Sequence, residues 1–295
     1  MSEETQVQTT AAKLGYPADA RLLIINADDF GMCHDENEAT IEGLRSGAFS
    51  SSTILVTCPW FEEAAEFARS TPSADLGVHL TLNAEWPRYK WGPVLGKSAV
   101  PSLADPRGYL WATVDLVYEH DQLDEVEREL RAQIDKALDA GIDVTHLDCH
   151  MGPLQMRASY HEVYAKIARD FRLPIRMVPR WAMERLGMKD VLEQIERDGT
   201  FFPDNFINPG KRTPETTPAF WIELLRRLPK GISEIYCHPA LARDELRNCA
   251  NDPEQRDADF RFFTSDTARR LLRDEGIELV GYRRLRDAQR AAARS

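Results

Sequence analysis

The chain has 295 residues, of which 43% are hydrophobic and 29% are charged, and its formal net charge is −11. A chain of this length can bury a large core, and its composition is that of an ordinary soluble globular protein. The negative charge argues against a nucleic-acid backbone or an anionic membrane as the main partner, but it leaves a neutral sugar open.

Short apolar or β-branched runs alternate with amphipathic segments along the chain, after a polar stretch at 1–20 that we expect to be a flexible lead-in. The runs predict strands, and the periodic segments between them predict helices. Strands are expected at 22–26, 52–57, 76–82, 144–150, 175–178, 232–237 and 277–282, with an unclear further strand near 201–208. Helices are expected at 35–47, 60–70, 123–140, 160–171, 181–200, 215–228 and 264–275.

This alternation predicts a parallel sheet, and with seven or eight strands a closed or nearly closed (β/α) barrel fits better than an open sheet. We expect one domain at 21–285 and a C-terminal tail at 286–295. A long insertion at 83–118 is rich in Pro, Gly, Trp and Tyr. Its aromatic side chains could stack on a sugar ring or pack against the barrel, and the sequence does not separate these two roles.

No apolar run approaches the length of a membrane span, and the polar start lacks the basic and apolar regions of a secretion signal. The five cysteines form no CxxC pair and are odd in number. They are typical of reduced thiols, so we expect a cytoplasmic protein.

The first predicted strand, LLIIN, stops abruptly at two adjacent carboxylates, Asp28 and Asp29. Ionised carboxylates are costly to bury unless a cation or hydrogen-bond donors meet them. Parallel α/β folds place their chemistry at the carboxyl ends of strands, so the pair indicates a functional site there. The alternative is that the two residues only cap the following helix.

Histidines mark the ends of three later strands. His79 lies in LGVHLTL, and by itself it would be interpreted as a core residue. In THLDCH, by contrast, strand side chains alternate, so His146, Asp148 and His150 lie on one face of the strand. His238 ends another strand just before a proline, where its alternative role is a buried histidine bonded to the backbone. A barrel would bring these strand ends together with the two aspartates at one mouth.

One carboxylate and two imidazoles form a facial site for a divalent metal with open positions for water and substrate. Such a set suits Zn²⁺, Co²⁺ or Ni²⁺ and also admits Mg²⁺, with Zn²⁺ or Mg²⁺ the leading expectations. A second carboxylate can take a proton from the water, and a further histidine can protonate a leaving group. These parts together predict hydrolysis of an amide or ester.

Four motifs resemble the YdjC-like carbohydrate deacetylases, the family that includes chitooligosaccharide deacetylases: INADDFG at 25–31, GVHLTL at 77–82, THLDCH at 145–150 and CHPA at 237–240. The resemblance implies a distorted (β/α) barrel related to the NodB-type polysaccharide deacetylases. It also implies Asp29, His79 and His150 as metal ligands, Asp28 as general base and His238 as candidate general acid. Asp148 and His146 would then orient His150.

Arg176, in PIRMVP, is a candidate partner that would hold Asp28 ionised, and its alternative is a surface arginine near a strand start. The chain departs from the family where THLDCH continues as Met151-Gly152-Pro153 instead of a histidine-rich run. That departure and the insertion fall where substrate would be held. The resemblance therefore supports the metal chemistry more strongly than it supports a particular sugar as substrate.

The sequence therefore predicts a metal-dependent hydrolase that removes an acetyl group from a small N-acetylated amino sugar or oligosaccharide. One alternative is a deacetylase of another glycoconjugate, such as a lipid-linked amino sugar. A second alternative is a barrel that binds sugar without catalysis. The oligomeric state stays open, with a homodimer as one arrangement.

Overall fold

Parallel strands form one curled sheet in the computed structural model, which describes residues 8–294. The strand order is β4-β3-β2-β1-β6-β5, and β7 pairs with the beginning of β1. The strands are β1 Arg21–Phe30, β2 Ser51–Ile54, β3 Leu76–Leu80, β4 Val144–Cys149, β5 Asn205–Ile207, β6 Gly231–Cys237 and β7 Ile277–Leu279. Strand β1 lies at the centre because its apolar run is buried on both faces.

The barrel is distorted between β4 and β5. The strand predicted at 175–178 is reduced to a single parallel bridge between Leu147 and Ile175, and the Ile175 N–H donates to the Phe201 carbonyl at 3.0 Å. Only these isolated contacts connect β4 to the chain that leads into β5, so the sheet curls into an incomplete barrel. The predicted parallel (β/α) architecture is confirmed, and the fifth strand is corrected to a bridge.

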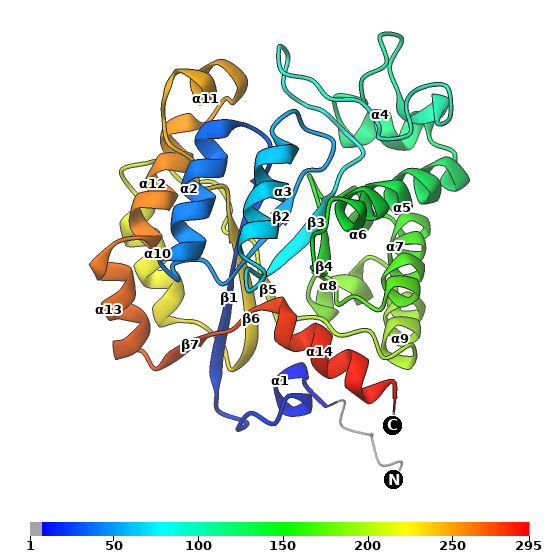
Figure 1. Cartoon of the computed structure of the whole chain (residues 1–295). Helices are drawn as coiled ribbons and strands as arrows, with labels where there is room; N and C mark the ends of the chain where they lie inside the picture. Colours follow the sequence, from blue (N-terminus) through cyan, green and yellow to red (C-terminus); the bar gives the residue numbers. More distant parts are fainter. Residues whose placement is uncertain (1–7, 295) are drawn as a thin grey trace.

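Helices cover the outer face of the sheet, as Figure 1 shows. Seven of them occur at the predicted places: α2 His34–Arg45, α3 Phe61–Ser70, α5 Leu123–Asp139, α7 Ala158–Phe171, α9 Lys189–Arg197, α10 Thr217–Arg226 and α13 Asp266–Asp274. The predicted helix at 181–200 is divided, because α8 Arg180–Arg185 ends before Gly187. Outside the insertion at 83–118 and the C-terminal α14, four further helices were not predicted: α1 Thr10–Lys13, α6 Pro153–Met156, α11 Asp244–Cys249 and α12 Pro253–Phe263.

The first and last described helices, α1 and α14, pack beneath the barrel (Figure 1). Helix α14, Tyr282–Ala292, includes most of the segment predicted as a tail from residue 286 onward. It buries Tyr282 and Leu285 against Ala11 of α1. Of the predicted lead-in, residues 1–7 lie outside the described part, and the remainder contains α1.

The insertion at 83–118 contains a 3₁₀ turn, η1 Pro101–Leu103, and helix α4 Val114–His120. Trp86 and Trp91 are buried, and the Trp91 indole N–H donates to the Asn83 carbonyl. Most of the insertion's aromatic surface therefore packs onto the barrel, and among its aromatic residues only Trp86 lines the large cavity at the carboxyl ends of the strands.

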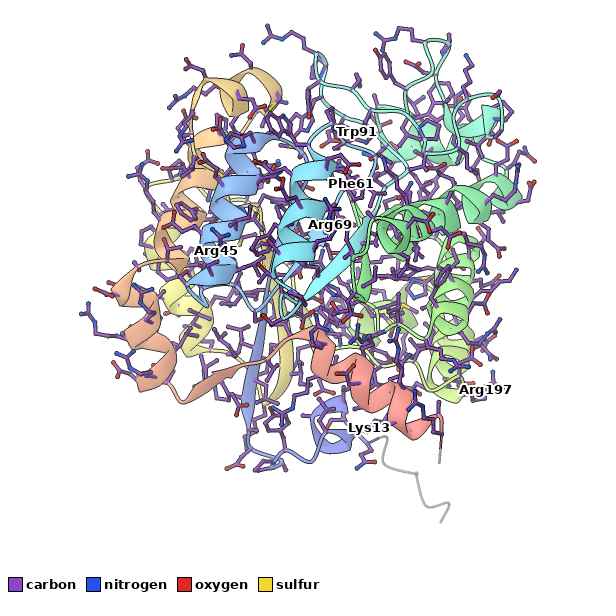
Figure 2. All side chains as sticks on the ribbon, in the orientation of Figure 1. Lys13, Arg45, Phe61, Arg69, Trp91 and Arg197 are labelled. Carbon is purple, nitrogen blue, oxygen red and sulfur yellow. The ribbon has the colours of Figure 1, made fainter. Side chains whose placement is uncertain are left out.

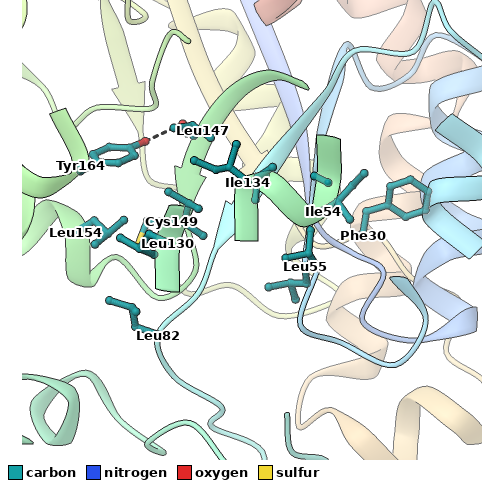
Figure 3. Packing of buried hydrophobic residues seen from close by; sticks show 14 of the residues in the cluster. Phe30, Ile54, Leu55, Leu82, Leu130, Ile134, Leu147, Cys149, Leu154 and Tyr164 are labelled. Carbon is teal, nitrogen blue, oxygen red and sulfur yellow. Dashed lines mark hydrogen bonds between the residues drawn. The ribbon is translucent and has the colours of Figure 1, made fainter. Parts of the chain in front are cut away.

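The core beside β4 is close-packed and apolar, apart from single hydrogen bonds such as that from the Tyr164 hydroxyl to the Leu147 carbonyl (Figure 3). Leu130 and Ile134 of α5 are completely buried there. Rigid packing of this kind holds the strand ends at fixed positions. None of the helices between residues 8 and 294 combines the length and the apolar character that crossing a bilayer requires.

Asp75, which directly precedes β3, is expected to make stability depend on pH. Burial raises the pKa of this carboxyl to about 6, against the lowering effect of hydrogen bonds from the Thr145 hydroxyl and the Arg283 N–H. Because the folded-state pKa exceeds the unfolded value of 3.8, the folded chain holds the proton more tightly between these pH values. Stability contributed by this group is therefore present below pH 4 and lost as pH rises to about 6.

The Asp75→Asn variant should lack this dependence. Relative to that variant, we expect the wild type to lose about 2–3 kcal/mol of unfolding free energy between pH 4 and pH 7. Urea unfolding at several pH values measures the difference. Parallel pH profiles for the two proteins would contradict the assignment.

Candidate metal centre and active site

Two adjacent carboxylates, Asp28 and Asp29, line one cavity of about 580 Å³ at the carboxyl ends of the strands. Neighbouring residues of a regular strand point to opposite faces. Here Asp29 has a left-handed backbone (φ 66°), and the register between β1 and β2 shifts between Ala27 and Phe30. This irregularity turns both carboxylates toward the same space. Both carboxylates therefore line one cavity at the strand end where the sequence predicted a site.

Asp29, His79 and His150 converge as the sequence predicted. The Oδ1 atom of Asp29 lies 3.3 Å from Nε2 of His79 and 3.2 Å from Nδ1 of His150. All three side chains are buried, and their candidate ligand atoms lie within 4.8 Å of one another. They come from three different strand ends and meet only because the barrel is curled.

Asp148 supports His79, not His150. It accepts a hydrogen bond from Nδ1 of His79 at 2.6 Å and another from the Thr53 hydroxyl at 2.8 Å. The register explains the contact, since His79 and Asp148 are direct partners on β3 and β4. This bond leaves Nε2 of His79 directed at Asp29.

His146 lies one layer deeper in the barrel and does not contact His150. Its ring stacks on Tyr282 at a centroid distance of 3.8 Å, and its Nδ1 lies 2.9 Å from the Thr145 hydroxyl. Gly77 permits this position, because a Cβ there would lie 2.6 Å from the His146 carbonyl oxygen. The predicted orienting roles are thus corrected: Asp148 orients a different histidine, and His146 packs in the interior.

Arg176 holds Asp28 in a bidentate ion pair, with both N···O distances at 2.7 Å. The arginine is buried, so its alternative role as a surface residue is wrong. Burial would raise the pKa of Asp28, but the charge and hydrogen bonds of Arg176 outweigh it and lower the pKa to about 2. Asp28 is therefore ionised at neutral pH.

The centre carries an excess of negative charge. Around the two guanidinium groups of Arg176 and Arg256 lie four buried or nearly buried carboxylates: Asp28, Asp29, Glu85 and Asp148. Burial raises the pKa of two further acids beside these arginines, Glu36 and Glu234, so we do not count them as full negative charges. Burial alone would lower the pKa of His79, yet Asp148 and Asp29 raise it to about 10. Glu85 and Asp29 likewise raise the pKa of His150 to about 9 against burial. A cavity that stabilises protonated imidazoles this strongly fits a divalent cation.

A second set of ligand atoms, from Asp28, His79 and Asp148, also falls within 4.8 Å. The oxygens of Asp28 are both bound by Arg176, and those of Asp148 are bound by Thr53, His79 and Arg176. Oδ2 of Asp29 is bound by Arg256, but its Oδ1 meets no arginine and faces the two imidazoles, so Asp29 with the two histidines is the set better placed to bind a metal.

His238 lies at the rim of the same cavity, with its side chain 31% exposed. Its Nε2 lies 3.8 Å from Oδ2 of Asp29. Enclosure of the ring lowers the pKa of His238, with Arg256 adding to the effect and Asp29 opposing it. The imidazole thus lines the same cavity as Asp28 and Arg176.

Three residues near the centre were missed by sequence reasoning. Arg256 of α12 donates to Oδ2 of Asp29 at 3.0 Å and to Glu36 at 2.6 Å. Glu85, from the insertion, lies 3.0 Å from Nε2 of His150. These three residues are notable only because their charges are buried, and burial cannot be read from the sequence. For Arg256 even the helix that carries it, α12, was not predicted.

Fold and site together define a (β/α)-barrel protein with a buried carboxylate–imidazole centre of the kind that holds a divalent metal. The model of the family described as "YdjC-like protein" matches residues 22–274. The chain therefore belongs to the YdjC-like family, and the resemblance seen in its four motifs is confirmed.

Curated relatives match almost end to end. A carbohydrate deacetylase of Thermus thermophilus is 34% identical over 257 residues, covering 85% of this chain and 89% of the relative. A chitooligosaccharide deacetylase of Yersinia enterocolitica is 30% identical over 271 residues, covering 89% and 96%. The crystal structure of an Enterococcus faecalis protein, proposed to cleave cellobiose phosphate, superposes with a TM-score of 0.77 at 31% identity, covering 90% of this chain and 99% of that one.

Proposed function

We propose that this protein is a metal-dependent deacetylase that hydrolyses the N-acetyl group of an amino sugar. One observation carries the proposal: Asp29, His79 and His150 meet at one point, while Asp28 stands beside them ionised and held by Arg176. The names of the curated relatives support a carbohydrate substrate.

Asp29, His79 and His150 would hold a divalent cation, with Zn²⁺ and Mg²⁺ as the leading candidates. When bound, such a cation polarises a carbonyl oxygen and acidifies water. The chain supplies the remaining parts. Asp148 keeps Nε2 of His79 directed inward, and Arg176 fixes both oxygens of Asp28 so that the carboxylate meets an incoming water in one orientation.

Asp28 acts as general base and takes a proton from the attacking water. The low pKa that Arg176 imposes keeps this carboxylate ionised over the whole physiological range. His238, once it has taken up a proton from the solvent that reaches its exposed edge, acts as general acid: it delivers that proton to the amine nitrogen as the C–N bond breaks, and acetate leaves. Its position at the rim gives it access to a substrate atom and to bulk water.

The cavity shape suits a sugar ring near the surface. Met151 and Met156 are about half exposed at its entrance, and Phe206 stacks with Tyr236 along its wall. Such apolar faces pack against sugar rings while nearby polar groups fix orientation. The site thus has room for a small N-acetylated sugar without distortion of the barrel.

The proposal is tested by acetate release from N-acetylglucosamine oligomers of increasing length, with metal content measured on the same sample. We expect turnover that a chelator abolishes and that added Zn²⁺, Co²⁺ or Mg²⁺ restores. Acetate release that is unchanged after complete metal removal would contradict the metal-dependent mechanism. Absence of release from every N-acetylated sugar would contradict the substrate class.

The same assay separates the two alternatives. Activity on lipid-linked amino sugars alone would move the substrate to another glycoconjugate while keeping the chemistry. Sugar binding without acetate release would indicate a non-catalytic barrel. The ionised base beside the ligand set favours catalysis, because a binding protein has no use for it.

A further inference from the structure

A recess of about 320 Å³ lies at the amino-terminal end of the barrel, away from the catalytic cavity. Its walls come from the chain just before the Ile175 bridge, from the segment leading into β5, and from the end of α14. Figure 2 labels Arg197 in this region, at the lower right beside the end of α14. Nothing in the proposed deacetylation uses this place.

Arginines dominate the lining. Arg169, Arg172, Arg197 and Arg290 face the recess, and Asp198 is the single carboxylate among the lining residues. Arg169 pairs with Asp198 at 3.5 Å and with Asp170 at 3.3 Å. Within residues 8–294, the other three arginines form no ion pair within 4.0 Å. This concentration of positive charge runs against a chain whose net charge is −11.

The nearest additional carboxylates are already engaged. Asp170 pairs with Arg131 at 2.5 Å, Asp287 pairs with Arg286 at 2.9 Å, and Asp143 also pairs with Arg286 at 2.6 Å. Asp170 is shared between Arg131 and Arg169, so Arg172, Arg197 and Arg290 are left without a carboxylate partner among the described residues.

Helix ends explain part of this arrangement. Helices α7, α9 and α14 all finish here, and a helix C-terminus carries about half a negative charge that attracts cations. Consistently, Nε of Arg290 donates to the Arg172 carbonyl and Nε of Arg197 to the Glu193 carbonyl, both at 3.3 Å. Together with Asp198 and the shared Asp170, three such ends offset about three of the four positive charges, so about one remains. Each of these hydrogen bonds uses only one of the five donors of its guanidinium group.

Arg290 shows the consequence of the excess. Burial lowers its pKa, and the charges of Arg286 and Arg172 lower it further, against the opposing effect of Asp143 and Asp287. A carboxylate partner raises the pKa of a buried arginine, as it does for Arg176 and Arg256 in this chain. The guanidinium of Arg290 is therefore in a positive environment that an anion would relieve.

We propose that this recess is a binding site for a small molecule that carries a phosphate group. Several guanidinium groups around one recess match the two negative charges and the oxygen geometry of a phosphate monoester better than those of a single carboxylate. The volume suits a small ligand, and the enclosure by three helix ends disfavours an extended polyanion. Phe201 and Ala293 supply an apolar side for the remainder of the ligand.

The test uses isothermal titration of inorganic phosphate into the full chain at constant ionic strength. We expect sub-millimolar binding that weakens at least tenfold in the Arg172→Gln/Arg197→Gln double variant. Both side chains are exposed, so the substitutions leave the core intact. Arg227→Gln is the matched control, because Arg227 also lies at a helix C-terminus, that of α10, but outside the recess. The affinity of this variant for phosphate should stay within twofold of the wild-type value.

Phosphate can also bind metals, so the His79→Ala variant provides the second control. Phosphate binding that persists in His79→Ala and is lost in the double arginine variant supports the recess. The reverse pattern would place the phosphate at the metal centre and overturn the proposal. Equal affinity in all variants, or no binding up to about 10 mM, would also overturn it.

Discussion

The Asp28→Asn variant is expected to lose about 10²–10⁴-fold in kcat for acetate release while its metal affinity stays near that of the wild type. The amide has nearly the shape of the carboxylate but cannot accept the proton of the attacking water. Metal affinity should persist because Asp28 contributes no atom to the group of Asp29, His79 and His150. Steady-state kinetics and metal titration on one preparation measure both quantities.

A matched control for this variant is Asp259→Asn. Asp259 is also a buried aspartate paired with an arginine, Arg212, but it lies outside the catalytic cavity. We expect this variant to keep its kcat within a few-fold. If Asp28→Asn retained near-normal turnover, Asp28 would not be the base, and the bidentate contact with Arg176 would have only a structural role.

The second large effect is expected from His79→Ala, which should purify with less than about one tenth of the wild-type metal content and without measurable turnover. The substitution removes one of three convergent ligands. It also takes away the histidine partner of Asp148, 2.6 Å from it, and so leaves a buried carboxylate with one partner fewer. The Asp148→Asn variant should show an intermediate result, with metal affinity weakened about 10- to 100-fold, because it removes only the group that orients the ligand. Elemental analysis after gel filtration measures the metal content.

His161→Gln is the control for these variants. His161 is a buried histidine of α7 whose Nδ1 lies 3.0 Å from the Leu154 carbonyl, far from the ligand group. Its replacement should leave metal content unchanged. Full metal occupancy in His79→Ala would show that the cation lies elsewhere in the cavity.

Asp148 connects the two halves of the site. It contacts His79 on the metal side, and its Oδ2 lies 3.0 Å from Nη1 of Arg176 on the side of the base. Arg176 continues to Glu234, which also accepts a hydrogen bond from the Tyr282 hydroxyl. Changes at Asp148 should therefore disturb metal binding and base orientation together, whereas changes at Asp28 should disturb only the base.

The fold was largely predictable because its signals are local. The apolar run of β1 and the stripe of α5 appear directly in the sequence, and both elements form where expected. The predictions failed where long-range contacts decide the structure. Residues 175–178 have a strand-like sequence, but only Ile175 pairs with a neighbour, and α14 is stabilised by packing beneath the barrel despite its highly charged sequence.

The candidate site shows the same division. Strand alternation and strand ends are local properties, so the residue types of the centre, Asp28, Asp29, His79, Asp148 and His150, could be read from the chain alone. Which carboxylate meets which imidazole depends on sheet register and on the left-handed backbone at Asp29, and both arise from packing between distant segments. Arg256 reaches Asp29 across 227 positions of sequence. No local pattern encodes such a contact, because its energy comes from burial and charge pairing that exist only once the barrel has formed.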